Sequence, residues 1–212
     1  MNLPNKLTIF RIILVAVMVI IPFIPVNEDL FGIPLTWIII DIIFIIASIT
    51  DKLDGYIARS RDEITTFGKF LDPIADKILV LTAMIMLVEA NRLPSWIPII
   101  VVFREFMVSG YRLVAVGNSG NVIAASIWGK LKTVTQMMAL ILALIDMNSF
   151  GTFINGNLQG FGLILNIAST VLMTISVIAT VFSGYDYLKN GKELFNSNTK
   201  KSEKEKITSK ES

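Results

Sequence analysis

A chain of 212 residues in which 53% are hydrophobic and only 17% are charged is too apolar for a water-soluble globule of this length. Histidine and cysteine are both absent, which excludes imidazole acid–base chemistry, thiol nucleophiles, disulfides and zinc sites built from nitrogen or sulfur ligands. The formal charge of +2 gives no indication of nucleic-acid binding. Any chemistry must therefore use oxygen ligands and hydroxyl groups.

Six apolar stretches have about the length that a membrane-spanning helix needs, which is roughly 20 residues. The predicted spans are Leu7–Val26, Leu35–Thr50, a third that is evident only over Ile78–Val88, Trp96–Val116, Ile127–Met147 and Phe161–Phe182. Because the third stretch is too short alone, its helix is predicted to begin earlier, in the charged segment before it. A cleaved signal peptide over residues 1–26 is disfavoured, since Arg11 interrupts the apolar run and no small-residue cleavage site follows.

The distribution of basic residues predicts the topology. Of the 19 Lys and Arg residues, all but Arg92 lie near the amino terminus, in 51–77, around the fourth-to-fifth connection or after Gly184. The positive-inside rule therefore places both termini and 51–77 in the cytoplasm. We expect an all-α, multi-pass plasma-membrane domain over 1–188, with a polar cavity that opens to the cytoplasm between the second and third helices. The charged segment 189–212 has no apolar period and is predicted to be a disordered cytoplasmic tail.

Two sets of residues keep helical spacing on either side of a short connection, so each set would lie on one face of its helix. The first set is Asp51, Asp54, Gly55, Ala58 and Arg59, and the second is Gly68, Asp72 and Asp76. A short connection between two helices would bring these faces together. The pattern predicts a site that both helices share.

Four carboxylates that converge near a helix end would repel one another, so they need a cation. Oxygen-only coordination favours Mg²⁺ or Mn²⁺ ahead of Ca²⁺, and four aspartates can hold two such ions. Gly55 and Ala58 leave space for a bulky ligand, and Arg59 offers a forked cation to a phosphate. We interpret the combination as a pyrophosphate site.

Each part of this pattern has a simpler explanation when it is taken alone. Asp72-Pro73 would be a good helix start, Asp51 and Asp54 would be solvated charges at the membrane edge, and Gly55 would end a helix. These explanations do not account for the helical register that the acidic, small and basic residues keep on both helices.

The pattern D-x2-D-G-x2-A-R-x8-G-x3-D-x3-D, with eight fixed residues over 26 positions, is complete here and resembles the signature of the CDP-alcohol phosphatidyltransferases. Further segments are similar to the phosphatidylglycerophosphate synthase branch of that family. These are Pro4-Asn5-Lys6-Leu7-Thr8 with Arg11, Arg104-Glu105-Phe106, Tyr111-Arg112, and Val122–Thr133 with Gln136-Met137.

The resemblance implies roles for individual residues. Asp51, Asp54, Asp72 and Asp76 would bind two Mg²⁺ or Mn²⁺ ions, and Asp76 would also be the catalytic base. The contacts implied for CDP-diacylglycerol are Gly55, Ala58, Arg59 and Gly68, with Thr65, Asn5 and Thr8 as further candidates. The implied reaction converts CDP-diacylglycerol and sn-glycerol 3-phosphate into phosphatidylglycerophosphate and CMP, and the implied assembly is a homodimer.

Ionisable residues within predicted membrane helices indicate a lined cavity or a partner, because burial in lipid is costly. Arg104 and Arg112 share a helix face, and Lys130 and Lys132 begin the fifth helix on the cytoplasmic side. Together these four residues predict a basic pocket for the phosphate of the acceptor. The alternatives are membrane anchoring for the lysines and, for Arg104-Glu105, a structural ion pair between helices.

Two other functions remain open. The same chemistry could use another acceptor, inositol phosphate or serine. A small divalent-cation transporter is the alternative from a different class, with the aspartates as its transport site. The carboxylates cluster at one membrane edge and the sequence has no evident inverted repeat, which favours the enzyme.

Overall fold

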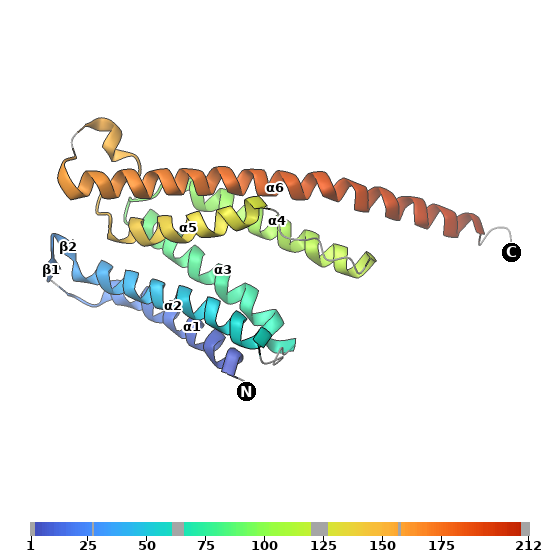
Figure 1. The fold of residues 1–212 in the computed structure, drawn as a ribbon, viewed down its shortest axis with the longest axis horizontal. Coiled ribbons are helices and arrows are strands. Elements are labelled where there is room, and N and C mark those ends of the chain that lie inside the picture. Colours follow the sequence, from blue (N-terminus) through green and yellow to red (C-terminus); the bar gives the residue numbers. More distant parts are fainter. Residues whose placement is uncertain (1–2, 27, 61–65, 120–126, 157, 209–212) are drawn as a thin grey trace. The chain divides into compact units, whose positions relative to one another are not determined.

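The computed structural model describes residues 3–26, 28–60, 66–119, 127–156 and 158–208. Within these ranges the side chains of 3–4, 52–60, 66–67, 69–70, 112–119 and 190–208 lie outside the description. The described residues form six α-helices and one short β-hairpin (Figure 1). The helices are α1 Leu3–Ile20, α2 Leu35–Ser60, α3 Thr66–Glu89, α4 Trp96–Ser119, α5 Ile127–Ile145 and α6 Gly160–Thr208.

The second and third helices extend through the charged segment, as the sequence predicts. α2 continues beyond Thr50 to Ser60, and α3 already begins at Thr66. Pro73 lies inside α3, so the interpretation of Asp72-Pro73 as a helix start is wrong. Proline has no N–H to donate to the preceding turn, so α3 lacks one backbone hydrogen bond at this position. Asp72 and Asp76 therefore follow each other on one face of a continuous helix.

The hairpin lies between α1 and α2 and was not expected from the sequence. Its strands are β1, Asp29–Leu30, and β2, Ile33–Pro34, and they pair antiparallel with Leu30 opposite Ile33. The turn residues Phe31 and Gly32 have φ values of 56° and 79°, the left-handed conformation that a two-residue hairpin turn requires. Glycine adopts it without cost, but phenylalanine gives no sequence signal for it.

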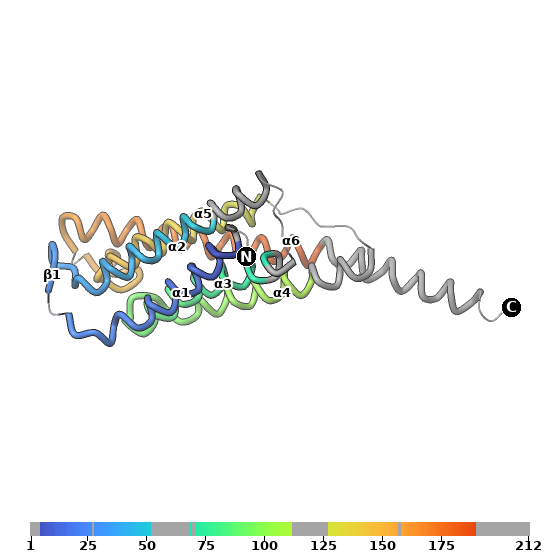
Figure 2. Tube along the Cα trace, turned by 90° about the horizontal axis from the view of Figure 1, so that it is seen from below, coloured from blue at the N-terminus to red at the C-terminus, as the bar shows by residue number. Residues whose placement is uncertain are grey.

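The chain forms two compact units. The first contains Met1–Pro98 and Thr135–Met173, and the second contains Ile99–Val134 and Thr174–Ser212. In the described part of the first unit, α1 packs along both α2 and α3 (Figures 1 and 2). The fully buried apolar side chains of the first unit include Met18, Ile40, Phe44, Leu79, Met84, Leu87, Ile97, Leu140 and Leu144. Those buried in the second unit are Val101, Val108, Val177, Ala179 and Tyr187.

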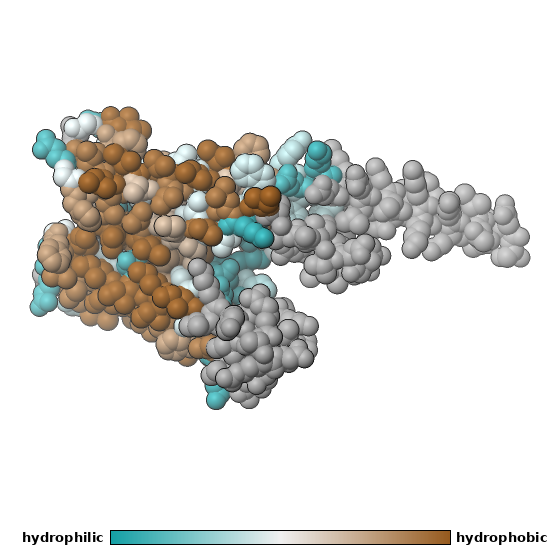
Figure 3. Space-filling view, in the orientation of Figure 1, coloured by the Kyte–Doolittle hydropathy of each residue, from teal (hydrophilic) through white to brown (hydrophobic). Residues whose placement is uncertain are grey.

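Large apolar side chains also remain exposed on the helices, and they colour much of the visible surface brown in Figure 3. In the described residues, three stretches are long and apolar enough to cross a membrane: Asn5–Phe23, Ile127–Ile145 and Gly160–Lys189. An apolar exterior of this kind is suited to lipid rather than to water. The six spans, the cytoplasmic termini and the cytoplasmic opening of a cavity stay predictions.

α6 continues to Thr208, into the range for which composition predicts disorder. Lys and Glu dominate this range, and both have high helix propensity. The division into a membrane domain over 1–188 and a tail over 189–212 stays a prediction.

Candidate active site

The amino-terminal helix contacts two of the predicted metal ligands. The hydroxyl Oγ1 of Thr8 donates a hydrogen bond of 2.6 Å to Oδ1 of Asp72 on α3. Nη1 of Arg11 lies 2.8 Å from Oδ1 of Asp51 on α2. Thr8 and Arg11 are both fully buried and lie three residues apart, on one face of α1. α1 therefore holds one carboxylate from each of the two helices that carry the motif.

The other predicted residues of this site are described to different extents. Gly68 is buried and Asp76 is half-buried, both on α3, and Asn5 is buried on α1. The prediction also includes five residues that lie outside the described side chains: Asp54, Gly55, Ala58, Arg59 and Thr65.

The donor chemistry of the site fits a divalent ion. Carboxylate oxygens are the ligands that Mg²⁺ and Mn²⁺ prefer, and the chain has no imidazole or thiol to offer a softer metal. No group of three acidic side chains close enough to hold an ion is found among the described residues, which do not include the side chain of Asp54. The four-aspartate site stays a prediction.

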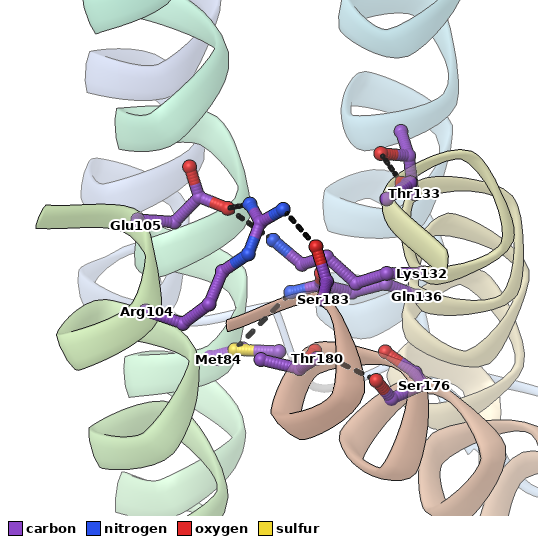
Figure 4. A network of polar contacts seen from close by, with 10 residues as sticks. Met84, Arg104, Glu105, Lys132, Thr133, Gln136, Ser176, Thr180 and Ser183 are labelled. Atoms are coloured by element: carbon purple, nitrogen blue, oxygen red, sulfur yellow. Dashed lines mark hydrogen bonds and ion pairs between the residues drawn. The ribbon is translucent and has the colours of Figure 1, made fainter. Parts of the chain in front are cut away.

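In the second unit, two basic residues of the predicted acceptor pocket come together (Figure 4). Arg104 of α4 and Lys132 of α5 both donate to Oε1 of Glu105, and the Arg104 bond measures 2.7 Å. Arg104 also donates to Oγ of Ser183 on α6 at 2.5 Å. The three ionised groups are largely buried, with 8–19% of each side chain exposed. Two cations and one carboxylate leave this cluster with a net charge of +1.

The structure agrees in part with the predicted basic pocket and in part with the alternative, an ion pair between helices at Arg104-Glu105. Glu105 forms an ion pair between helices, but its partner across that interface is Lys132, because Arg104 is its neighbour on α4. Lys130 is exposed, and the side chain of Arg112 lies outside the description. The structure thus brings Arg104 and Lys132 together and leaves Lys130 at the surface.

A second polar cluster of the first unit lies where α3, α5 and α6 meet their loops. Asp146, which is 2% exposed, accepts hydrogen bonds from Asn148, Asn166 and Ser169 at 2.8–3.0 Å. This cluster is not predictable from the sequence, because its residues come from separate segments without a shared period.

Arg92 is part of the same cluster. Its guanidinium lies 4.0 Å from the ring centroid of Trp37 and donates to the carbonyl oxygen of Leu144 at 3.1 Å. Burial lowers the pKa of Arg92 to about 10, and the charge of Asp146 opposes this shift. A cavity of about 10 Å³ between Arg92 and Asp146 has room for a single water molecule.

The sequence did not predict the contacts that two residues, Arg11 and Ser183, make in the candidate sites. Arg11 appeared only as part of a motif, and its partner Asp51 lies on another helix. Ser183 carried no signal at all, since a lone serine in an apolar helix is common. An ionisable residue within the first apolar stretch was the signal that could have identified Arg11.

Comparison with known proteins finds the same family that the motif resembles. The chain matches the family described as CDP-alcohol phosphatidyltransferase over residues 1–182. It is 40% identical to the CDP-diacylglycerol–glycerol-3-phosphate 3-phosphatidyltransferase of Bacillus subtilis, over 93% of this chain and 99% of that protein. The proteins of the same name from Haemophilus influenzae and Rickettsia bellii are each 37% identical, over 90% and 92% of this chain and 94% and 97% of theirs.

Proposed function

Because the chain belongs to the CDP-alcohol phosphatidyltransferase family, we propose that it transfers the phosphatidyl group of CDP-diacylglycerol to sn-glycerol 3-phosphate. The products are phosphatidylglycerophosphate and CMP, in the biosynthesis of phosphatidylglycerol. The observation that carries this proposal is the 40% identity to the Bacillus subtilis enzyme, which extends over 99% of that protein.

In the proposed reaction, the primary hydroxyl oxygen of the acceptor attacks the phosphorus atom that carries diacylglycerol. The bond from this phosphorus to the oxygen of CMP breaks, and CMP leaves with the electron pair. Asp76 accepts the proton of the attacking hydroxyl. Its position one helical turn after Asp72 supports this role, because both carboxylates then lie on one face of α3.

Asp51, Asp54, Asp72 and Asp76 would hold two Mg²⁺ or Mn²⁺ ions. When bound, these ions supply charge neutralisation for the diphosphate and for the departing CMP. The residues proposed to contact the nucleotide are Gly55, Ala58, Arg59 and Gly68, with Asn5, Thr8 and Thr65 as further candidates. Gly68 supports this arrangement, because it lies one helical turn before Asp72 on the face of α3 that carries both carboxylates.

Arg104 and Lys132 would bind the phosphate of glycerol 3-phosphate, with Arg112 and Lys130 as further contacts. The convergence of Arg104 and Lys132 on one carboxylate oxygen supports this assignment, because it fixes two cationic donors close together. A serine or other acceptor without a phosphate would have little use for such a pair.

The enzyme would lie in the plasma membrane with its active site toward the cytoplasm, where glycerol 3-phosphate and CMP are soluble. Both termini would lie on that side, and the protein would form a homodimer. The distribution of basic residues supports the orientation, since 18 of the 19 lie in segments that would face the cytoplasm.

A substrate panel tests the proposal. Purified protein is given labelled CDP-diacylglycerol with glycerol 3-phosphate, inositol phosphate or serine, and CMP release and lipid product are measured. We expect product only with glycerol 3-phosphate. Product with another acceptor would change the assigned substrate, and metal flux without CMP release would replace the enzyme by the transporter.

A further inference from the structure

Two residues of α1 each contact a different motif helix. The Thr8 hydroxyl donates to Asp72 on α3, and the Arg11 guanidinium pairs with Asp51 on α2. Among the described residues, α1 packs along both of these helices. α1 therefore contributes to the relative position of the two carboxylates.

Both contacts leave part of the carboxylate available. Thr8 and Arg11 each engage one oxygen, Oδ1, of their aspartate, and a carboxylate has about four sites that can accept a bond. Arg11 is 0% exposed, but 34% of the Asp51 side chain is accessible. Asp72 is likewise only half-buried. One side of each carboxylate is thus fixed by α1 while another side stays open.

We infer that Thr8 and Arg11 are positioning residues for the metal-binding carboxylates, and that they orient Asp72 and Asp51 from the side of α1 without coordinating the ion. The inference rests on the proposed function, because it assumes that these aspartates bind divalent ions. Such outer partners hold ligands in the geometry that the ion requires, and their loss typically weakens metal affinity by roughly 10- to 100-fold.

The opposite role for Arg11 is that of a competing cation, which occupies Asp51 until an ion displaces it. The burial of Arg11 argues against this role, because a guanidinium without solvent contact has no exposed site to which it could withdraw. The two roles predict opposite signs. Removal of a positioning residue weakens metal binding, whereas removal of a competing cation strengthens it.

Binding of Mn²⁺ to the purified full-length protein, followed by electron paramagnetic resonance, tests the inference without relying on turnover. Thr8→Val removes the hydroxyl at nearly constant shape, Thr8→Ser restores it, and Arg11→Lys keeps the charge but not the fork. Thr180→Val is the matched control, because Thr180 is equally buried and its hydroxyl bonds only the carbonyl oxygen of Ser176 in its own helix.

We expect roughly 10-fold or greater weakening of Mn²⁺ binding in Thr8→Val and Arg11→Lys, with wild-type affinity in Thr8→Ser and Thr180→Val. Unchanged binding in Thr8→Val, or tighter binding in Arg11→Lys, overturns the inference and leaves the proposed function intact. Absence of Mn²⁺ binding in the wild-type protein overturns both. If Arg11→Lys does not fold, the Mn²⁺ affinity of the nearly isosteric variant Thr8→Val is sufficient to test the inference.

Discussion

Two acidic groups of the first unit differ in how completely their hydrogen-bonding capacity is satisfied. Asp146 uses both oxygens to accept hydrogen bonds from three residues and is 2% exposed. Arg11 pairs with one oxygen of Asp51, and 34% of that side chain remains accessible. A fully satisfied carboxylate has no capacity left for a ligand, whereas a partly satisfied one does. By this criterion Asp146 belongs to a structural cluster, whereas Asp51 has accepting capacity left for a ligand.

Removal of the proposed metal ions should have the largest effect on activity. It should act through the partly accessible carboxylates, such as Asp51 and Asp72, and not through Asp146. We expect a chelator to abolish CMP release and to lower the thermal unfolding midpoint, since an ion at about 100 times its dissociation constant stabilises the folded state by about 2.7 kcal/mol. Added Mg²⁺ should restore both quantities, measured by CMP release and by a thermal unfolding scan. Full activity in the chelator would contradict the assignment of Asp51 and Asp72.

Replacement of the proposed base, Asp76, should have the second-largest effect on activity. Asp76→Asn keeps the size of the side chain but cannot accept the proton, so we expect kcat to fall by roughly 10²- to 10⁴-fold. The unfolding midpoint should stay close to that of the wild type, because Asp76 is only half-buried. Steady-state kinetics and a thermal scan measure the two quantities. Retention of most of the activity would show that another group takes the proton.

The acceptor cluster should give a smaller and more selective change. Arg104→Gln removes a charged donor, and we expect the KM for glycerol 3-phosphate to rise roughly 10-fold while that for CDP-diacylglycerol stays constant. Lys189→Gln is the control, because this exposed lysine belongs to no predicted pocket, is screened by solvent and salt, and should change KM by about twofold or less. Equal effects of the two substitutions would refute a distinct role for Arg104.

Loss of the satisfied carboxylate should leave catalysis unchanged. Asp146→Ala deprives Asn166 and Ser169 of their acceptor and Arg92 of its nearby charge, so we expect a loss of about 3 kcal/mol in stability. That loss corresponds to a fall of roughly 6–12 °C in the unfolding midpoint. Activity measured well below this midpoint should match the wild type. A specific loss of turnover would assign the cluster a functional role.

Local periodicity was enough to predict the helices. Residues 51–59 and 68–76 each keep a helical spacing, so the extension of α2 and of α3 through them followed from spacing. The hairpin did not follow, because Phe31 adopts a left-handed conformation to which its residue type gives no preference.

Contacts between residues that are far apart in the sequence could not be predicted. Thr8 and Asp72 are 64 positions apart, and two of the three partners of Asp146, Asn166 and Ser169, lie on α6. Periodicity indicates which face of a helix is apolar, but it does not indicate which polar residue of another helix lies opposite. The sequence therefore predicts the acidic residues as a set, but it does not predict that Thr8 bonds Asp72 or that Arg11 pairs with Asp51.

The bond between Thr8 and Asp72 also has a consequence for biogenesis. A ribosome adds roughly 5–20 residues per second, so Asp72 is made about 3–13 s after Thr8. Arg11 lies closer to the start than to the end of the apolar stretch Asn5–Phe23, so in the nascent chain it opposes membrane insertion by less than the about 2.5–3.5 kcal/mol that an arginine costs at the centre of a span. The bond between Thr8 and Asp72 forms only after α3 has been made, so the packing of α1 is completed late.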